Sequence, residues 1–148
     1  MSDFLERLNI FLGERALVAD VEQLTPDAST REYFRITWNN STAIACVYPE
    51  PFVAAEQTYL DVTRLFQAAN LPVAEVFDLD ETLGVIVQED FGNTILRDVL
   101  ERSSSAEKQA LMDESIAMIA RIQSATALAY ETGSIASKLK FDTEKLLW

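Results

Sequence analysis

The stretch V85-I-V-Q-E-D-F-G-N-T-I-L-R-D-V-L100 decides how this chain is organised. Its apolar start is typical of a buried strand, and two acids followed by Gly92 end that run. Asn93 is a favourable N-cap for a short helix through about Arg102. The pattern therefore predicts a strand over Leu83–Glu89 that passes through a short connection into a helix.

The remaining elements follow from the same kinds of periodicity. Before the junction we expect a helix from Phe4 to Leu12 that stops at Gly13, strands at Ala16–Leu24, Glu32–Trp38 and Thr42–Tyr48, a helix at Phe52–Ala69, and a strand at Val73–Leu79. The turn N39-N-S41 suits a hairpin, because Asn tolerates positive φ. After the junction, Ser104 and Glu107 have the capping-box spacing for a long helix over about Ala106–Tyr130.

The inner face of that long helix should carry Leu111, Ser115, Met118, Ile119 and Ile122. Further on, Asp142 resembles another N-cap, with Phe141 and Leu146 as a hydrophobic staple. The sequence thus ends at Trp148 while a helix is opening. We therefore expect the chain to be a truncated part of a longer protein.

The composition argues against several classes of function. The 148 residues carry 24 acidic and 12 basic side chains, a formal charge of −12, which disfavours a nucleic-acid partner. No apolar run approaches the roughly 18 residues of a membrane span, and the N-terminal segment lacks a signal-peptide pattern. The single Cys46 cannot form an intramolecular disulfide, which fits the cytoplasm. Because the sequence has no histidine, a His base or His metal ligand within this chain is excluded.

Six short motifs, in their order along the chain, resemble a known family. They are D27-A-S-T-R-E-Y-F-R35, A43-I-A-C-V-Y-P49, E56-Q-T-Y-L-D-V-T-R-L65, L71-P-V73, V87-Q-E-D-F-G92 and F141-D-T-E-K-L-L147. This order resembles the protein-kinase-like aminoglycoside phosphotransferase superfamily, and in particular its bacterial N-acetylmuramate/N-acetylglucosamine kinases. The resemblance implies an α+β fold. A kinase-like N-lobe over residues 1–92 would hold a five-stranded antiparallel sheet and a helix, and residues 93–148 would begin a truncated helical C-lobe.

In that family, residues 25–35 would form the hairpin over the nucleotide phosphates. The resemblance places there Asp27, Ala28, Ser29, Thr30 and Arg31. Small residues would let backbone N–H groups approach an anion, and the hydroxyls would add donors. Pro26 stands where a glycine is usual, and an ordinary polar β-turn is the alternative.

The resemblance also places Ile44 and Cys46 of the third strand in the nucleotide site. Cys46 occupies the position where most kinases have a phosphate-pairing Lys. Because a thiol supplies no positive charge, either Arg31 or a metal ion compensates, or the nucleotide is held less tightly. Cys46 itself is best interpreted as a small buried hydrophobic residue. Glu56 falls where kinases have a helix glutamate, but without the Lys we favour a solvated acid on the helix surface.

At the junction, Gln88 would line the back of the purine pocket. The carbonyl of Glu89 and the N–H of Phe91 would face the base, and the alternative is a strand that ends in an acidic loop. Two further acids, Asp78 and Asp80, flank a turn and are expected to serve its geometry. Asp98 on the following helix could contact ribose, but we favour the alternative that its side chain simply faces water.

The chemistry of the family requires an Asp on a loop after the long helices, a nearby Asn and a metal-binding Asp. None of these motifs occurs in the sequence. We therefore expect ATP and Mg²⁺ as cofactors, with the Mg²⁺ ligands outside this chain, no catalytic residue within it, and no phosphate transfer by the chain alone. A small-molecule hydroxyl acceptor would be bound mainly by the missing C-lobe. The apolar face of the long helix would then be exposed and would favour self-association or a partner.

These expectations describe the nucleotide-binding N-terminal part of an ATP-dependent small-molecule phosphotransferase. The parent protein would phosphorylate a hydroxyl of a sugar or amino sugar in cell-wall sugar recycling, with aminoglycoside, choline or homoserine as alternative acceptors. Two other functions stay open. One is a non-catalytic acidic α+β module that binds a protein through its long helix, and the other is a degenerate kinase lobe kept as a scaffold.

Overall fold

The structure is a computed structural model that describes residues 3–25 and 30–138. The chain forms two compact units. The first unit contains residues 1–54 and 74–91, and the second contains residues 55–73 and 92–148. The chain therefore passes from one unit to the other more than once.

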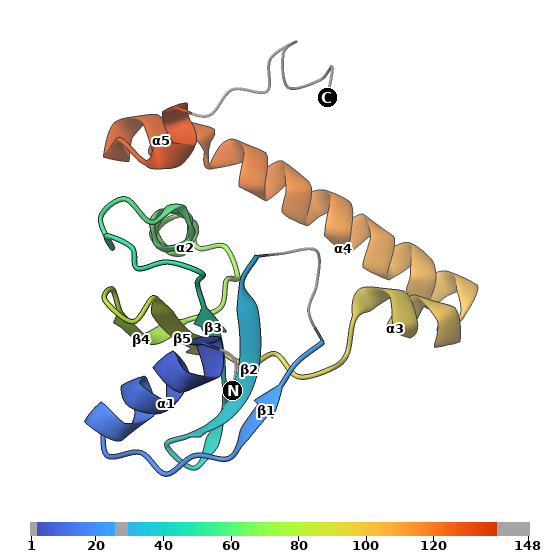
Figure 1. The fold of residues 1–148 in the computed structure, drawn as a ribbon. Coiled ribbons are helices and arrows are strands. Elements are labelled where there is room, and N and C mark those ends of the chain that lie inside the picture. Colours follow the sequence, from blue (N-terminus) through green and yellow to red (C-terminus); the bar gives the residue numbers. More distant parts are fainter. Residues whose placement is uncertain (1–2, 26–29, 139–148) are drawn as a thin grey trace. The chain divides into compact units, whose positions relative to one another are not determined.

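The first unit is built on a five-stranded antiparallel sheet (Figure 1). Its strands are β1 (Val21–Gln23), β2 (Glu32–Trp38), β3 (Ser41–Val47), β4 (Val76–Asp80) and β5 (Val85–Glu89). They lie in the order β1-β2-β3-β5-β4, so β1 and β4 form the two edges. The α+β class and the five-stranded antiparallel sheet expected from the sequence are confirmed.

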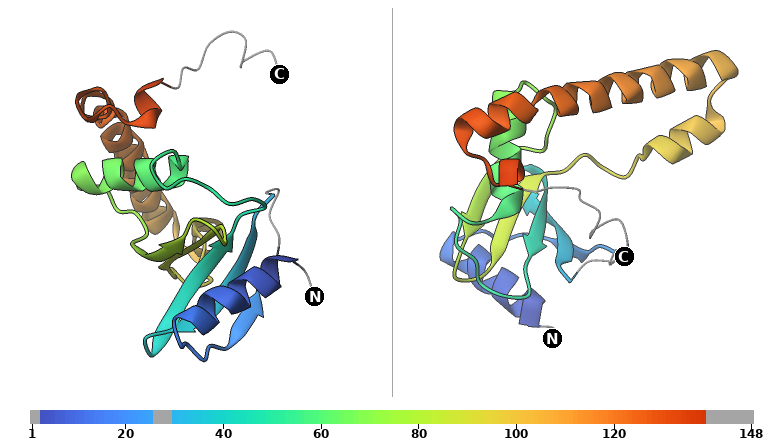
Figure 2. Two further views of the ribbon diagram at one scale, coloured as in Figure 1. Left: turned by 60° about the vertical axis from the view of Figure 1, so that its left-hand side comes forward. Right: turned by 90° about the horizontal axis from the view of Figure 1, so that it is seen from above.

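Helix α1 (Asp3–Glu14) packs against one face of this sheet (Figures 1 and 2). Successive side chains of a strand point to opposite faces, so alternate residues of three strands meet the helix. The buried set is Leu8, Phe11 and Leu12 of α1 with Phe34, Ile36, Ala43, Ala45, Val47, Val85 and Val87 of the strands. We call these strand residues the α1 face of the sheet.

Two tight turns connect neighbouring strands of the sheet. Asn39 and Asn40 have φ of 47° and 65° between β2 and β3, as the predicted hairpin requires. Between β4 and β5, the Asp80 carboxylate accepts hydrogen bonds from Thr82 N at 3.0 Å and Leu83 N at 2.9 Å. The geometric role expected for Asp80 is therefore confirmed.

The second unit is helical. Its elements are α2 (Thr58–Ala68), α3 (Leu96–Arg102), α4 (Ser105–Ser124), α5 (Thr126–Thr132) and the 3-10 helix η1 (Ile135–Lys138). α3 lies beside the start of α4 (Figure 2). The Asp61 carboxylate of α2 accepts hydrogen bonds from Ser134 Oγ at 2.5 Å and Ile135 N at 2.9 Å. Arg121 of α4 donates to Asn70 O at 2.6 Å, so α2 and its C-terminal end are joined to the later helices.

The expected boundary between the first helix and the first strand is wrong. The helix continues past Gly13, and Ala16 takes the left-handed φ of 53° that usually belongs to a helix-ending glycine. Leu17 N donates to Leu12 O at 3.0 Å, which closes the helix in a Schellman-type cap. Because residues 15–17 make this cap, the strand expected over Ala16–Leu24 shortens to β1.

The expected start of the second helix is also wrong, because α2 begins at Thr58 and not near Phe52. Phe52 N donates to Glu81 O at 3.0 Å, and its ring lies 5.2 Å from that of Tyr48. These contacts hold Phe52 in the first unit, before the chain enters the second. The side chain of Gln57 caps α2 by accepting a hydrogen bond from Tyr59 N at 3.3 Å.

The long helix is correct at its start and wrong at its end. Ser104 and Glu107 form the expected capping box, but the helix ends at Ser124 and α5 follows as a separate helix. Ser124 Oγ donates to Arg121 O and Thr126 Oγ1 to Gln123 O, both at 2.7 Å. Such hydroxyl bonds to the preceding turn often bend helices, and two of them accompany the break.

One further expectation about the helical region is corrected. Ile95, and not Asn93, occupies the N-cap position of α3, and it makes no side-chain capping hydrogen bond. Ile119 and Ile122 of the expected inner face of α4 are 56% and 39% exposed, which agrees with the expectation that this apolar face is exposed in the chain. The cap expected at Asp142 lies outside the described residues.

Candidate functional site

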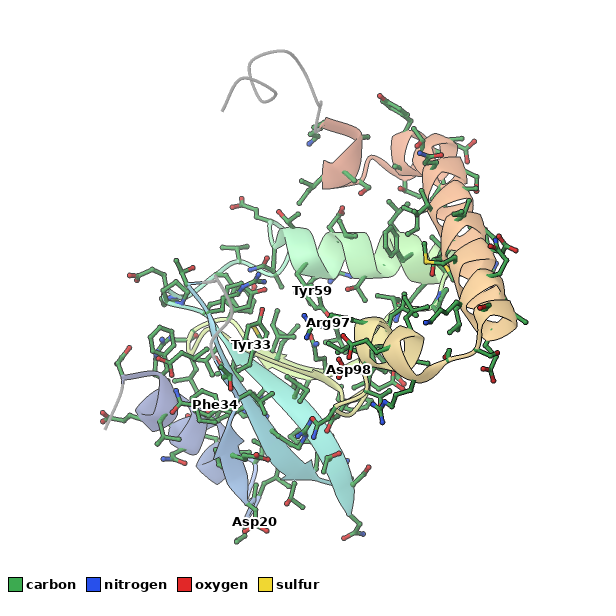
Figure 3. All side chains as sticks on the ribbon, turned by 90° about the vertical axis from the view of Figure 1, so that its right-hand side faces the viewer. Asp20, Tyr33, Phe34, Tyr59, Arg97 and Asp98 are labelled. Carbon is green, nitrogen blue, oxygen red and sulfur yellow. The ribbon has the colours of Figure 1, made fainter. Side chains whose placement is uncertain are left out.

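The sheet face opposite α1 brings predicted site residues of two strands together. We call Tyr33, Arg35, Ile44, Cys46, Ile86 and Gln88 the opposite face of the sheet. In the strand register, Ile44 is the partner of both Arg35 and Gln88, and Cys46 is the partner of both Tyr33 and Ile86. Figure 3 labels Phe34 on the α1 side of β2 and Tyr33 on the other side. The sequence-predicted residues Ile44, Cys46 and Gln88 therefore share one face.

A cation and two aromatic rings surround Cys46. Arg31 Nη1 donates to the Tyr48 hydroxyl at 3.4 Å, and the guanidinium lies 5.9 Å and 5.4 Å from the ring centroids of Tyr33 and Tyr48. Burial raises the pKa of the Cys46 thiol to about 11, although the Arg31 charge opposes this shift. The thiol is therefore neutral at physiological pH. This agrees with the interpretation of Cys46 as a small buried side chain, with the Arg31 charge beside it.

The predicted phosphate hairpin is only partly described. Thr30 is exposed, and the partly buried Arg31 leads into β2. Asp27, Ala28 and Ser29 lie outside the described residues. The assignment of this hairpin to phosphate binding stays a prediction.

The last residues of β5 lead into the predicted base-reading connection. We call residues 89–91 the hinge segment. Glu89 N donates to Glu75 O at 2.8 Å, and the Glu89 carboxylate accepts a hydrogen bond from Glu75 N at 3.2 Å. This acid side chain thus has a structural contact with the segment before β4. Phe91 is 69% exposed, and the base contacts expected of the hinge backbone stay predictions.

An ion pair between β2 and the hinge segment was not anticipated from the sequence. Arg35 Nε donates to Asp90 Oδ2 at 2.7 Å, and Arg35 Nη2 donates to Asp90 Oδ1 at 3.2 Å. Alternation along β2 does place Arg35 on the opposite face, and Asp90 follows the apolar run directly. The two residues are far apart in sequence, however, so periodicity gives no reason to pair them.

Glu56 is not where the resemblance suggested. It lies in the turn before α2, and not on the helix surface, and it is exposed. Solvation, which we favoured for this acid, is confirmed, whereas its helical position is wrong. It belongs to the second unit, whereas Cys46 belongs to the first.

The other acids considered above have structural contacts. Burial alone would raise the pKa of Asp78, but hydrogen bonds from Arg15 and from Leu79 N hold it below its usual value. The Arg15 Nε to Asp78 Oδ2 distance is 2.5 Å. Asp98 is partly exposed and lies 3.6 Å from Arg97 Nε in the unit that contains α3 (Figure 3).

Two further features concern residues 3–25 and 30–138. Over these residues, no group of three or more acidic or thiol side chains converges in a way that could hold a metal ion. Over the same residues, none of the helices is both long enough and apolar enough to cross a bilayer.

Comparisons with known proteins agree with the motif order. Residues 20–146 match the phosphotransferase enzyme family. The chain is also similar to the N-acetylmuramate/N-acetylglucosamine kinase of Neisseria meningitidis serogroup B (strain ATCC BAA-335 / MC58), at 32% identity over 108 residues. That alignment covers 72% of this chain and 32% of the kinase, so the chain spans about a third of the length of this curated relative. No solved structure matches. The expected resemblance is thereby confirmed.

Proposed function

Because the chain belongs to the phosphotransferase enzyme family, we propose that it is the nucleotide-binding part of an ATP-dependent small-molecule kinase. The observation that carries this proposal is the family match over residues 20–146, which includes all five strands of the sheet. The opposite face supports it, because Ile44 and Gln88 are direct neighbours there and Arg31 lies beside Cys46.

The proposed nucleotide site uses residues of the first unit. The base lies near Ile44 and Gln88, with the hinge backbone at its edge. The phosphates lie towards Thr30 and Arg31, where hydroxyl and guanidinium donors suit an anion. In this proposal residues 1–92 act as the N-lobe and residues 93–148 begin the C-lobe. Mg²⁺ would bridge the phosphates of bound ATP, with its protein ligands supplied from outside this chain.

The acceptor proposed for the parent protein is a hydroxyl of a sugar or amino sugar. The similar Neisseria protein is named for two amino-sugar substrates, and this supports the choice over an aminoglycoside, choline or homoserine. The acceptor would be bound mainly outside this chain. We also propose that the chain acts in the cytoplasm and transfers no phosphate alone, because its sequence lacks the family's catalytic acid motifs.

Isothermal titration with ATP and Mg²⁺ tests the nucleotide proposal. We expect saturable heat at one site per chain and competition by adenosine. Circular dichroism on the same sample establishes that the protein is folded. A folded protein that gives no heat with ATP would contradict the proposal and favour a non-catalytic module or a degenerate lobe.

A second candidate function is a protein-binding module. The observation in its favour is a set of exposed apolar residues on α4, of which Ile116 and Ile119 are 60% and 56% exposed. Exposed apolar patches of this kind mark interaction surfaces. Sedimentation at several protein concentrations tests self-association through this surface. A monomer at every concentration would argue against self-association through this surface.

A further inference from the structure

The contact between Arg35 and Asp90 lies where β5 ends. The ladder between β3 and β5 has its last pair at Ala43 and Glu89, so Asp90 is the first residue beyond it. The Asp90 side chain is only 4% exposed, and that of Arg35 is 17% exposed. A carboxylate so deeply buried is unfavourable unless it is paired and hydrogen-bonded. The pair is therefore a buried and specific contact, unlike the more exposed contact between Arg97 and Asp98.

The geometry of the pair restricts the chain after β5. Two roughly parallel hydrogen bonds join the guanidinium to both carboxylate oxygens, at 2.7 Å and 3.2 Å. Such a fork fixes direction as well as distance. The hydrogen bond to Asp90 is also the main reason that the pKa of Arg35 is raised.

Arg35 connects three segments of the first unit. It belongs to β2, it holds Asp90 after β5, and its Nη1 lies 3.8 Å from Glu22 Oε2 on β1. It is also the register partner of Ile44, which lies in the proposed base site. One guanidinium thus links the strands beside that site to the segment whose backbone would read the base.

We infer that Arg35 and Asp90 are positioning residues for purine recognition. Their ion pair holds the hinge segment against the sheet, so that the Glu89 carbonyl and the Phe91 N–H sit at the distance needed to bind the edge of adenine. The ligand chemistry concerned is an adenine nucleoside, and the phosphates lie outside the reach of this contact. This inference rests on the proposed nucleotide-binding function.

Breaking the pair should change binding of the base without changing binding of the phosphates. Asp90→Asn keeps the size of the side chain but removes its charge. We expect its affinity for adenosine to fall about tenfold, which corresponds to one misplaced hydrogen bond to the base. Affinity for inorganic tripolyphosphate should stay within about twofold, because the phosphate hairpin is unchanged. A role limited to stability would not produce this difference between the two ligands.

The experiment compares adenosine and tripolyphosphate titrations of the whole 148-residue chain and its variants. Asp78→Asn is the matched control, because Asp78 also pairs with an arginine in the first unit, but that arginine, Arg15, packs over Phe11 of α1, so this contact lies on the side of the sheet away from the proposed base site. It should lower the melting temperature and leave both affinities unchanged. Arg35→Lys is the second test variant and covers the case in which Asp90→Asn does not fold. It should show the same selective loss to a smaller extent, since lysine cannot form the two-bond fork.

The possible results separate this inference from the function on which it rests. If the unmodified protein binds neither adenosine nor ATP, the proposed function fails and the inference fails with it. If the unmodified protein binds adenosine and folded Asp90→Asn or Arg35→Lys binds it equally well, the inference alone is overturned. An equal loss for adenosine and tripolyphosphate would also overturn it, because that result indicates general disruption of the unit.

Discussion

The two faces of the sheet are formed by alternate residues of the same strands, yet they are held in different ways. The α1 face is entirely apolar, and Phe34, Ile36 and Val87 on it are at most 1% exposed. The opposite face mixes buried Ile86 with a charged arginine and a glutamine. Packing against a helix sets the first face, whereas individual charge and hydrogen-bond partners set the second. The second face can therefore change its chemistry while the core under α1 remains intact.

Two matched isoleucine variants test this difference, and they should have the largest effect. Ile36 lies on the α1 face, and the partly buried Ile44 lies on the opposite face of the neighbouring strand. Ile36→Ala should lower the free energy of unfolding by about 2–5 kcal/mol, as expected for truncation in a packed core. Ile44→Ala should cost about 1 kcal/mol, because less apolar area is lost from a site that already contacts solvent.

Urea unfolding followed by circular dichroism measures both values, and ATP titration of the folded variants completes the comparison. Ile44→Ala should bind ATP more weakly despite its smaller effect on stability. Equal destabilisation by the two substitutions would show that the faces do not differ energetically.

The α1 face was predictable from the sequence because burial imposes a simple period. Alternation in Glu32–Trp38 gave the bounds of β2, and the asparagines at 39 and 40 gave its turn. Both signals are local, since they depend on strand geometry and on the tolerance of Asn for positive φ. The family motifs then selected Ile44, Cys46 and Gln88, which the strand register brings onto one face.

What the sequence could not reveal depends on partners distant along the chain. Phe52 looked like part of a helix, but its backbone bond to Glu81 and its contact with Tyr48 keep it outside α2. The pairing of Arg35 with Asp90 likewise appears only once β2 and β5 are in register with β3. A period of two places Arg35 on the correct face, but it cannot identify the acid that meets it.

The next largest expected effect is a change in the free energy of unfolding with pH, caused by titration of Cys46, a buried residue of the opposite face. Its pKa is about 11 in the folded chain, against 9.0 as the ordinary value, mainly because of burial. The folded state therefore holds the proton more tightly, and this contribution to stability is complete below about pH 9. It should be lost as the pH rises from about 9 to about 11, by about 2–3 kcal/mol in total.

Urea unfolding at a series of pH values measures this loss, and Cys46→Ala is the variant to compare. The variant should lose less stability than the unmodified protein across that window. Tyr48, whose pKa is also raised by burial, remains in both proteins and accounts for part of the alkaline loss. Identical pH dependence of the two proteins would contradict the burial of a neutral thiol at this position.

Substitution of Arg31 is expected to weaken binding of the phosphates and not of the base, whereas substitution of Asp90 should weaken binding of the base and not of the phosphates. If Arg31 supplies the charge that Cys46 cannot, Arg31→Gln should weaken binding of tripolyphosphate and ATP about tenfold, the value of one charge-assisted hydrogen bond. Adenosine affinity should be unchanged. Arg31→Lys is the control, because it keeps the positive charge and should retain most of the affinity. Unaltered ATP binding by Arg31→Gln would exclude Arg31 as the compensating charge and leave a metal ion or a less tightly held nucleotide as the explanation.

The smallest expected effect identifies which acid partner of Arg35 matters. Glu22 is 3.8 Å from the Arg35 guanidinium, but its side chain is 69% exposed, whereas the Asp90 side chain is 4% exposed. Solvent screens an exposed pair, so Glu22→Gln should change stability by no more than about 0.5 kcal/mol. Its adenosine affinity should equal that of the unmodified protein. A loss of adenosine affinity comparable to that of Asp90→Asn would mean that the charge of Arg35, and not the fork that it forms with the hinge segment, controls base binding.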